Sequence, residues 1–283
     1  MSSNRNQTAR ELLAFYLEAG VDAVLGETAI DRFADTAETS RRPASGRTAW
    51  QAPGAGDPQP GNRPALDRSG PAAPAAAPIP LPPDSAVMAA REQARNATTL
   101  DELRSILDGF TGCTLRATAT RLVFADGNPR ARVMFVGEAP GRDEDIAGLP
   151  FVGRSGQLLD RMMTAIGLTR ANAYIANIVP WRPPGNRTPT PQESAICLPF
   201  TLRQIELVDP DVLVCLGGPS AQTLLGSRDG ILKTRGRWFA FQTGSREIRA
   251  IATLHPAYLL RQPLQKRLAW RDFLAIRKAL APS

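Results

Sequence analysis

Four carboxylates follow a short apolar run in the middle of the chain. The run covers residues 133–136 and leads into the turn Gly-Glu-Ala-Pro-Gly, residues 137–141. The carboxylates fall within eight positions and are Glu138, Asp143, Glu144 and Asp145. An apolar strand that ends in glycines places such groups at the edge of a sheet, where a helix N-terminus also points. Carboxylates there suit a site that handles water or developing positive charge better than one that only binds phosphate.

An amide and a histidine stand in comparable places. Asn177 lies in a second apolar run, residues 173–179, which leads into the rigid basic loop 180–187. His255, the only histidine of the chain, follows a third apolar run, residues 251–254, and precedes a proline. An amide can read the edge of a nucleic-acid base. An imidazole can donate a hydrogen bond to a developing anion.

Apolar runs alternate with helical patterns over the C-terminal two thirds of the chain. Strands are expected at residues 121–125, 133–136, 174–178, 212–216 and 249–254, and helices at residues 85–96, 100–107, 155–166, 191–208, 219–225 and 265–280. Near-continuous apolar strands joined by crossover helices predict a parallel sheet covered on both faces. The carboxyl ends of such strands lie along one edge of the sheet, which is where ligands bind in α/β folds.

Three segments, in this order, resemble the uracil-DNA glycosylase superfamily and most closely its family 4 branch. They are GEAPGRDED with GLPFVGRSG, then YIANIVPWRPPGNRTPTPQE, then LHPAYLLR. The resemblance extends from Thr98 to Leu280. It implies a three-layer αβα fold with a central, mostly parallel four-stranded sheet. It also implies a monofunctional DNA glycosylase of base excision repair, which flips uracil out of DNA and hydrolyses its N-glycosidic bond to leave an abasic site.

The resemblance assigns the residues that would hold uracil. Phe151 matches the phenylalanine that stacks on the flipped base, Asn177 the asparagine that pairs with its edge, and His255 the histidine beside uracil O2. The substrate-binding set is completed by Gly137, Ala139, Pro140 and Gly141. Each of the three side chains also has a structural alternative: a core phenylalanine, a buried amide bonded to local backbone, and a structural histidine before proline.

Glu138 and Glu144 are the carboxylates expected to handle the water and to stabilise positive charge. Ala139 stands where family 1 enzymes carry their catalytic aspartate, so that aspartate is absent here. The spacing does not settle which carboxylate takes its role; Glu138 is ranked above Glu144, with His255 as the third catalytic residue. Asp143 and Asp145 are expected to cap the turn or to face solvent.

The segment from Pro256 to Arg261 resembles the loop that enters the DNA minor groove. Leu259 or Leu260 would be the wedge that replaces lost stacking, and Arg261 would reach phosphate. With the basic loop, the expected DNA-binding residues are Arg182, Asn186, Arg187, Pro256, Tyr258, Leu259, Leu260 and Arg261.

Metal ligation is where the chain departs from the family. Family 4 enzymes hold a [4Fe–4S] cluster with four cysteines, and only Cys113 and Cys197 remain at the matching positions. Phe110 and Trp181 occupy the other two, and Cys215 lies in a core strand. The sequence therefore predicts no iron–sulfur cluster and no other cofactor, with apolar side chains filling the space.

Composition divides the chain into three parts. Residues 1–35 carry a helical pattern, residues 36–84 are rich in proline and alanine and predict a disordered linker, and residues 85–283 form the catalytic domain. Residues 99–283 hold 24 basic and 16 acidic residues, a net charge of +8, whereas residues 1–98 have a net charge of −1. A basic domain suits binding to the phosphate backbone of DNA, although 31 of the 34 basic residues are arginine, which a GC-rich genome also produces.

Several further expectations concern the setting of the protein. Without an apolar run near 18 residues or a basic-then-apolar leader, neither a membrane span nor a secretory signal is expected, so the protein is placed in the cytoplasm, in the bacterial cytosol and nucleoid. It is expected to be a monomer that binds uracil-containing single- or double-stranded DNA and the abasic product. The N-terminal helical segment is expected to be either a peripheral brace on the core or a docking element for a protein partner.

Two alternative functions stay open at this point. A catalytically weak protein could bind uracil or abasic DNA and recruit repair partners through its N-terminal tail. A Rossmann-like enzyme acting on free nucleotides is the third possibility, but the basic domain and the LHPAYLLR segment argue against it.

Overall fold

The computed structural model describes residues 83–281. The expected N-terminal helical segment, residues 1–35, and nearly all of the expected linker lie outside these residues. The first described element is helix α2, Pro83–Asn96. The predicted linker, residues 36–84, includes the first two residues of α2, so this helix begins two residues earlier than predicted.

A six-stranded sheet forms the centre of the domain, in the strand order β1-β3-β2-β4-β6-β5. The strands are β1 Asp126–Gly127, β2 Val133–Gly137, β3 Tyr174–Asn177, β4 Val212–Leu216, β5 Trp238–Gln242 and β6 Glu247–Thr253. The four inner strands are parallel, and β1 and β5 pair antiparallel at the two edges. The three-layer, mostly parallel fold is confirmed, but the sheet has six strands instead of four because two edge strands extend it.

The strand expected at residues 121–125 does not form; only Asp126 and Gly127 pair with β3. The backbone N–H groups of Thr120 and Arg121 donate instead to the Asp145 carboxylate, at 2.8 and 3.2 Å. The N–H of Val123 donates to the carbonyl of Pro180 at 2.9 Å. Because these backbone N–H groups already have partners, they cannot form the ladder of hydrogen bonds that would pair this segment with a neighbouring strand.

Ten α-helices form among the described residues, besides the short 3-10 helices Pro184–Asn186 and Pro263–Gln265. After α2 they are α3 Leu100–Gly109, α4 Leu115–Thr118, α5 Arg142–Ala147, α6 Arg154–Thr164, α7 Pro191–Val208, α8 Gly218–Leu225, α9 Ile231–Thr234, α10 Pro256–Arg261 and α11 Lys266–Leu280. Capping boxes start two of them, from Thr99 to Glu102 in α3 and from Thr190 to Glu193 in α7. All six expected helices are confirmed; the short helices α4, α5, α9 and α10 were not predicted.

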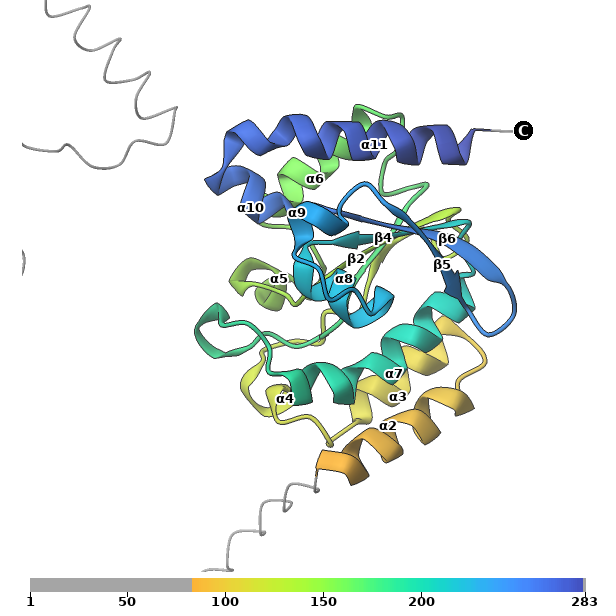
Figure 1. Ribbon diagram of the computed structural model, residues 1–283. Helices are drawn as coiled ribbons and strands as arrows, with labels where there is room; N and C mark the ends of the chain where they lie inside the picture. The colour runs from red at the N-terminus through yellow and green to blue at the C-terminus, as the bar shows by residue number, and fades with distance from the viewer. Residues whose placement is uncertain (1–82, 282–283) are drawn as a thin grey trace, which may run out of the picture. The chain divides into compact units, whose positions relative to one another are not determined.

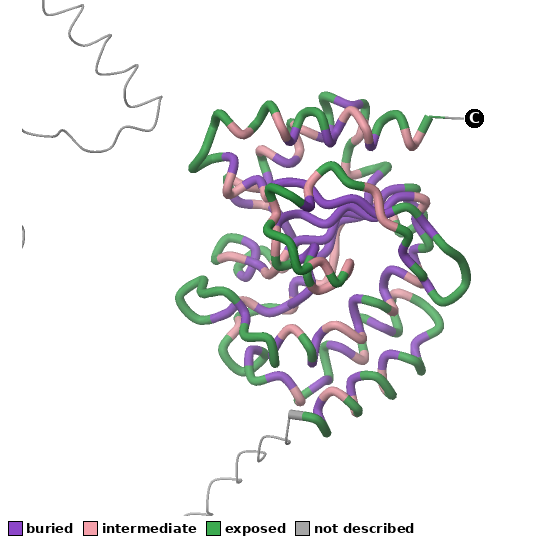
Figure 2. The backbone as a smooth tube through the Cα atoms, in the orientation of Figure 1, coloured by how far each residue is buried: buried purple, intermediate pink, exposed green. Residues whose placement is uncertain are grey.

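Helices cover both faces of the sheet (Figure 1). On one face α6 and α11 pack over Val133 and Phe135 of β2; on the other, α2, α3 and α7 pack with Met134 and Val136. Figure 2 shows the inner strands as a continuous buried layer between partly exposed helices. This two-sided burial explains why the strands read as unbroken apolar runs rather than alternating ones.

The parallel strands end at one edge of the sheet, and all three sequence motifs leave the sheet there. The turn after β2 leads to α5, Asn177 closes β3, and His255 follows β6 and caps α10. Strand β2 lies between β3 and β4, and α6, which follows it, lies on the opposite face from α7 (Figure 1). This change of direction opens a crevice beyond the strand ends. Within residues 83–281, no helix is long and apolar enough to cross a bilayer.

Candidate active site

A cavity of about 180 Å³, here called the inner cavity, lies beyond the carboxyl ends of the parallel strands. It brings together residues from all three motifs. Its lining consists of Ala139, Pro140, Gly141, Glu144, Phe151, Ser155, Asn177, His255 and Ala257. Ser155 and Ala257 were not predicted, although both lie inside the quoted motifs.

Gly137 leaves the space in which two side chains of this cavity lie. A Cβ atom at this position would lie 2.4 Å from Asn177 Oδ1 and 2.7 Å from Phe151 Cζ. Both distances are far shorter than van der Waals contact, so only glycine lets the amide and the aromatic ring approach the end of β2 together. Gly137 therefore acts by leaving space, which is a role that a turn glycine in the sequence does not reveal.

Asn177 holds a buried acceptor without a protein partner. Its side chain is 5% exposed, and Oδ1 has no hydrogen-bond partner among the described residues. A buried polar atom that stays unpaired costs free energy, about 1–3 kcal/mol. Such an atom at the edge of a cavity is typical of a group held ready for a donor on a ligand. The structural alternative, an amide that bonds local backbone through Oδ1, is not what the structure shows.

His255 has a fixed orientation at the other side of the inner cavity. Its Nδ1 accepts a hydrogen bond from the backbone N–H of Ala257 at 3.1 Å. In a neutral imidazole the proton must then sit on Nε2, which makes Nε2–H a donor. Burial, aided by the positive charge of Arg261, lowers the pKa of His255 to about 4. At neutral pH the ring is therefore an uncharged donor.

Phe151 forms a wall of the inner cavity in a strained backbone conformation. It is 5% exposed, has φ of 55°, and its ring centroid lies 5.5 Å from that of His255. Arg170 holds the turn by donating to the carbonyls of Phe151 and Pro150, at 2.5 and 3.1 Å. A Cβ at Gly156 would lie 1.7 Å from the Phe151 carbonyl oxygen. Arg170 is a positioning residue that carries no sequence signal.

Glu138 is the half-buried carboxylate directly after β2. Its Oε1 is buried without a hydrogen-bond partner among the described residues. Burial raises the pKa of the Glu138 carboxyl above its ordinary value, opposed by a hydrogen bond from Thr188. A carboxylate with a raised pKa and a free acceptor is suited to taking a proton from water.

Glu144 is differently placed. It is 8% exposed, and its two oxygens accept hydrogen bonds from the backbone N–H groups of Gly141, Val152 and Gly153, at 3.0 to 3.1 Å. The carboxylate therefore ties the turn after β2 to the turn that follows Phe151. Asp145 is also buried and binds the backbone of Thr120 and Arg121, so it does not face solvent; the exposed Asp143 does.

A second hollow of about 560 Å³, here called the outer groove, adjoins the inner cavity and shares four residues with it. The shared residues are Gly141, Glu144, Ser155 and Ala257. Three arginines line the outer groove, at Arg142, Arg154 and Arg261, together with Asn186 and the exposed Leu260. Arg142 and Arg154 were not predicted as DNA contacts, although each begins a helix that follows a glycine of the motifs.

The structure places some of the other predicted DNA-binding residues in the interior and leaves others exposed. Leu259 is fully buried against Leu254 and Ala269, so it is a core residue, and of the two wedge residues only Leu260 is exposed. The expected loop is helix α10, which buries Pro256 and packs Tyr258 on the same apolar cluster.

Two arginines of the basic loop are held by neighbouring side chains. Arg182 donates to Asn186 Oδ1 at 2.7 Å. Arg187 forms two hydrogen bonds with the Glu193 carboxylate, at 2.8 and 2.6 Å. Arg187 is therefore paired with Glu193, which belongs to the capping box of α7, while Asn186 lies at the outer groove.

Two cysteines lie together on the face of the sheet that α2, α3 and α7 cover. The Cys197 thiol donates to the Cys113 sulfur at 3.9 Å, and both residues are buried. The hydrogen bond with the Cys113 sulfur, together with burial, raises the pKa of Cys197. Phe110 and Trp181 belong to the same buried apolar cluster as the two thiols, whereas Cys215 belongs to another.

Comparison with known proteins finds several similar type-4 uracil-DNA glycosylases. One from Archaeoglobus fulgidus is 39% identical over 63% of this chain and 92% of its own length. One from Thermotoga maritima is 45% identical over 53% of this chain and 78% of its own length. A third, from Sulfurisphaera tokodaii, is 36% identical over 65% of this chain and 86% of its own length.

These relatives overturn the prediction that the chain has no cofactor. Type-4 enzymes are iron–sulfur enzymes, so an iron–sulfur cluster is the cofactor that the comparison supports. Cys113 and Cys197 would provide two sulfur ligands to such a cluster, but Phe110 and Trp181 offer no ligand atom. No group of three or more metal-binding side chains forms within the part of the chain that the structure describes. The residues present therefore provide only two of the four cysteine ligands of such a cluster.

A family model describes the relationship over the part of the chain that holds the sheet and the site. The model of the uracil DNA glycosylase superfamily matches residues 124–274, more than half of the chain. The matched range contains the inner cavity, the outer groove and all six strands. The chain therefore belongs to the uracil-DNA glycosylase superfamily, near its type-4 branch.

Proposed function

We infer that this chain is a uracil-DNA glycosylase, a hydrolase of base excision repair that acts on the N-glycosyl bond of uracil in DNA. The observation that carries this conclusion is the inner cavity, where Asn177 at the end of β3, Phe151 in the turn before α6 and His255 at the start of α10 meet. The type-4 relatives support the same activity. The substrate is uracil-containing DNA and the product is free uracil with an abasic site.

Recognition of the base follows from the polarity of Asn177. Its unpaired Oδ1 accepts from the N3–H of uracil, and its amide N–H group donates to O4. Cytosine presents an acceptor and a donor at these two positions, so both contacts would be lost. Phe151 supplies the stacking face for the flipped base.

The proposed reaction breaks the bond between C1′ and N1 while water adds to C1′. The electron pair of the broken bond passes to the uracil ring, whose O2 receives a hydrogen bond from the His255 Nε2–H. Glu138 takes a proton from the attacking water and offsets the positive charge that develops on the sugar. The uracil anion then takes up a proton from solvent, and Glu138 releases its proton to solvent. Glu144 acts as a positioning residue, since backbone N–H groups occupy both of its oxygens.

The outer groove is the proposed route for the DNA strand. Arg142, Arg154 and Arg261 place positive charge along it, and phosphate contacts of this kind position DNA without reading sequence. Leu260 is the proposed wedge because it is the exposed leucine of α10.

We further propose that the enzyme works as a monomer in the cytoplasm. The segment 1–35 would recruit a protein partner through the helical pattern of its sequence, joined to the catalytic domain by the Pro/Ala-rich stretch. These assignments are supported by sequence pattern alone.

Release of uracil from labelled single- and double-stranded oligonucleotides tests the function. The protein is incubated with strands that contain one uracil or, as the control, one thymine, and alkali then cleaves at abasic sites. We expect cleavage only at uracil. Tight binding to uracil or abasic DNA without cleavage at any salt concentration would show a lesion-binding protein on a glycosylase fold.

Exchange of Asn177 for aspartate tests base recognition. Asn177→Asp removes the donor to O4 and places a charge at a buried site. We expect kcat/KM for uracil to fall by about 10²–10³, since a lost hydrogen bond and an unpaired buried charge each cost on the order of 2 kcal/mol. The preference for uracil over cytosine should also narrow. An unchanged preference in the same excision assay would remove the role assigned to Asn177.

A further inference from the structure

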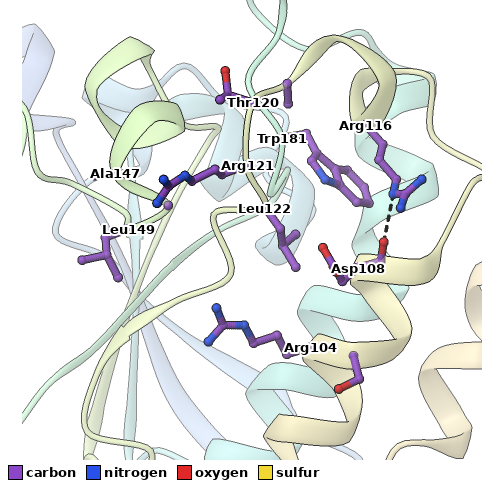
Figure 3. Close-up of a pocket in the computed structure, with 12 residues that line it drawn as sticks. Arg104, Asp108, Arg116, Thr120, Arg121, Leu122, Ala147, Leu149 and Trp181 are labelled. Carbon is purple, nitrogen blue, oxygen red and sulfur yellow. Dashed lines mark hydrogen bonds between the residues drawn. The ribbon is translucent and has the colours of Figure 1, made fainter.

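A separate hollow of about 860 Å³, here called the arginine hollow, lies between α3, the segment before β1 and the end of α5 (Figure 3). It shares no residue with the inner cavity or the outer groove. Its charged side chains are Arg104, Arg116, Arg121 and Asp108. Three guanidinium groups against one carboxylate leave a positive balance, and neither the proposed reaction nor the DNA contacts above use it.

Two of these arginines are free to bind a ligand. Arg104 and Arg121 are exposed, and within residues 83–281 neither side chain has a hydrogen bond or an ion pair with a carboxylate. Figure 3 shows both guanidinium groups extending into the space beside Leu149, while Arg116 turns away to the carbonyl of Asp108. A pair of unpaired guanidiniums over one hollow is suited to phosphate oxygens.

Helix α5 connects the arginine hollow with the active site. Asp145 accepts from the backbone of Thr120 and Arg121 and from the Thr120 hydroxyl, at 2.8 to 3.2 Å. The adjacent Glu144 lines the inner cavity. The position of Arg121 is therefore fixed relative to the helix that borders the site.

The distance between the two places suits a continuous DNA strand. Arg142, at the start of α5, lines the outer groove, and Ala147, at its end, lines the arginine hollow. A rise of 1.5 Å per residue separates them by about 8 Å. Successive nucleotides of a strand rise about 3.4 Å, so at α5 the arginine hollow lies about two to three nucleotides from the outer groove.

We propose that the arginine hollow binds backbone phosphates of the DNA strand flanking the flipped uracil, through Arg104 and Arg121. Leu122 and Leu149, which also line it, offer apolar contacts to the sugar. The hollow extends the DNA-binding surface beyond the outer groove, and the proposal rests on the glycosylase function. Because the contacts are to phosphate, they add affinity without sequence preference.

The test compares the double variant Arg104→Gln/Arg121→Gln with a matched control. The control, Arg277→Gln/Lys278→Gln, also removes two positive charges. These lie at the exposed end of α11, on the face of the sheet opposite α3 (Figure 1). Both are assayed for kcat and kcat/KM on a minimal single-stranded oligonucleotide with a central uracil. Longer oligonucleotides are extended on the 5′ side only or on the 3′ side only.

We expect the double variant to lose about tenfold or more in kcat/KM on one extended series, as for the loss of charged hydrogen bonds. Its activity on the minimal substrate and its kcat should stay at the level of the control. The slope of log affinity against log salt should fall by about 1.4, or about 0.7 for each phosphate contact on a single strand.

Two outcomes separate failure of this proposal from failure of the function. If the unaltered protein releases uracil and the double variant matches the control on both extended series with the same salt slope, the arginine hollow does not bind DNA. If the unaltered protein releases no uracil from any substrate, the glycosylase function itself is lost.

Discussion

Glu138→Gln should lower the rate of uracil excision by about 10²–10⁴, the usual contribution of a general base. The amide keeps the size of the side chain but cannot take a proton from water. It also removes the negative charge that offsets the developing cation on the sugar. Since the carboxylate is proposed to act on water and not on the base, binding of uracil-containing DNA should change little.

Single-turnover excision at saturating protein, with a gel shift on the same samples, separates these two effects. Glu92→Gln is a suitable control, because it makes the same chemical change on an exposed face of α2. A loss of less than threefold in Glu138→Gln, or an equal loss of binding and rate, would contradict the role in water activation.

The pH profile gives an independent reading of Glu138. The reaction needs the ionised carboxylate, and burial raises the pKa of Glu138 above its ordinary value. The rate should therefore rise as pH increases through this raised pKa. The pKa of His255, lowered to about 4, lies below this range. In Glu138→Gln the acid limb should disappear, and a limb that persists would mean that another group is titrating.

The sequence was informative where function depends on strand ends. Apolar runs predicted the four parallel strands, and parallel strands must end at one edge of the sheet. That geometry is sufficient to bring Asn177 and His255 to one cavity. Phe151 depends on more: a positive φ, the clearance at Gly156 and the hydrogen bonds from Arg170. These contacts join residues far apart in sequence, so no local pattern reports them.

The different roles of the two glutamates could not be predicted from the sequence for the same reason, because they depend on contacts that no local pattern reports. Glu138 and Glu144 lie six positions apart and look alike in the sequence. Backbone N–H groups bind both oxygens of Glu144, whereas Oε1 of Glu138 has no partner among the described residues. Leu259 and Leu260 show the same limit, because only the orientation of α10 decides which is exposed. The arginine hollow had no motif at all, since it joins arginines from α3 and from the irregular chain before β1.

His255→Ala should lower kcat/KM by about 10²–10³, the usual loss when one donor to a developing anion is removed. In the proposed reaction, the Nε2–H bonds to O2 more strongly as negative charge moves onto uracil. Excision by His255→Ala under the same single-turnover conditions measures this loss. A loss below tenfold would make His255 a structural residue that caps α10.

The charge state of His255 can be observed directly because it is the only histidine of the chain. In protein freed of any histidine tag, nitrogen-detected NMR should show one imidazole, protonated on Nε2 at neutral pH and titrating near 4. A titration near 6.5, or a proton on Nδ1, would contradict a neutral donor held by the Ala257 N–H.

The same shift predicts how stability depends on pH. In the unfolded chain His255 has its ordinary pKa of about 6.5, whereas burial lowers it to about 4 in the fold. Between these values the unfolded state binds more protons, so this contribution to the free energy of unfolding is complete above pH 6.5 and is lost as pH falls towards 4. Its full size is about 3 kcal/mol. Denaturation of the unaltered protein and of His255→Ala across this range should differ in slope, because the variant lacks the proton uptake; equal slopes would show that His255 titrates alike in both states.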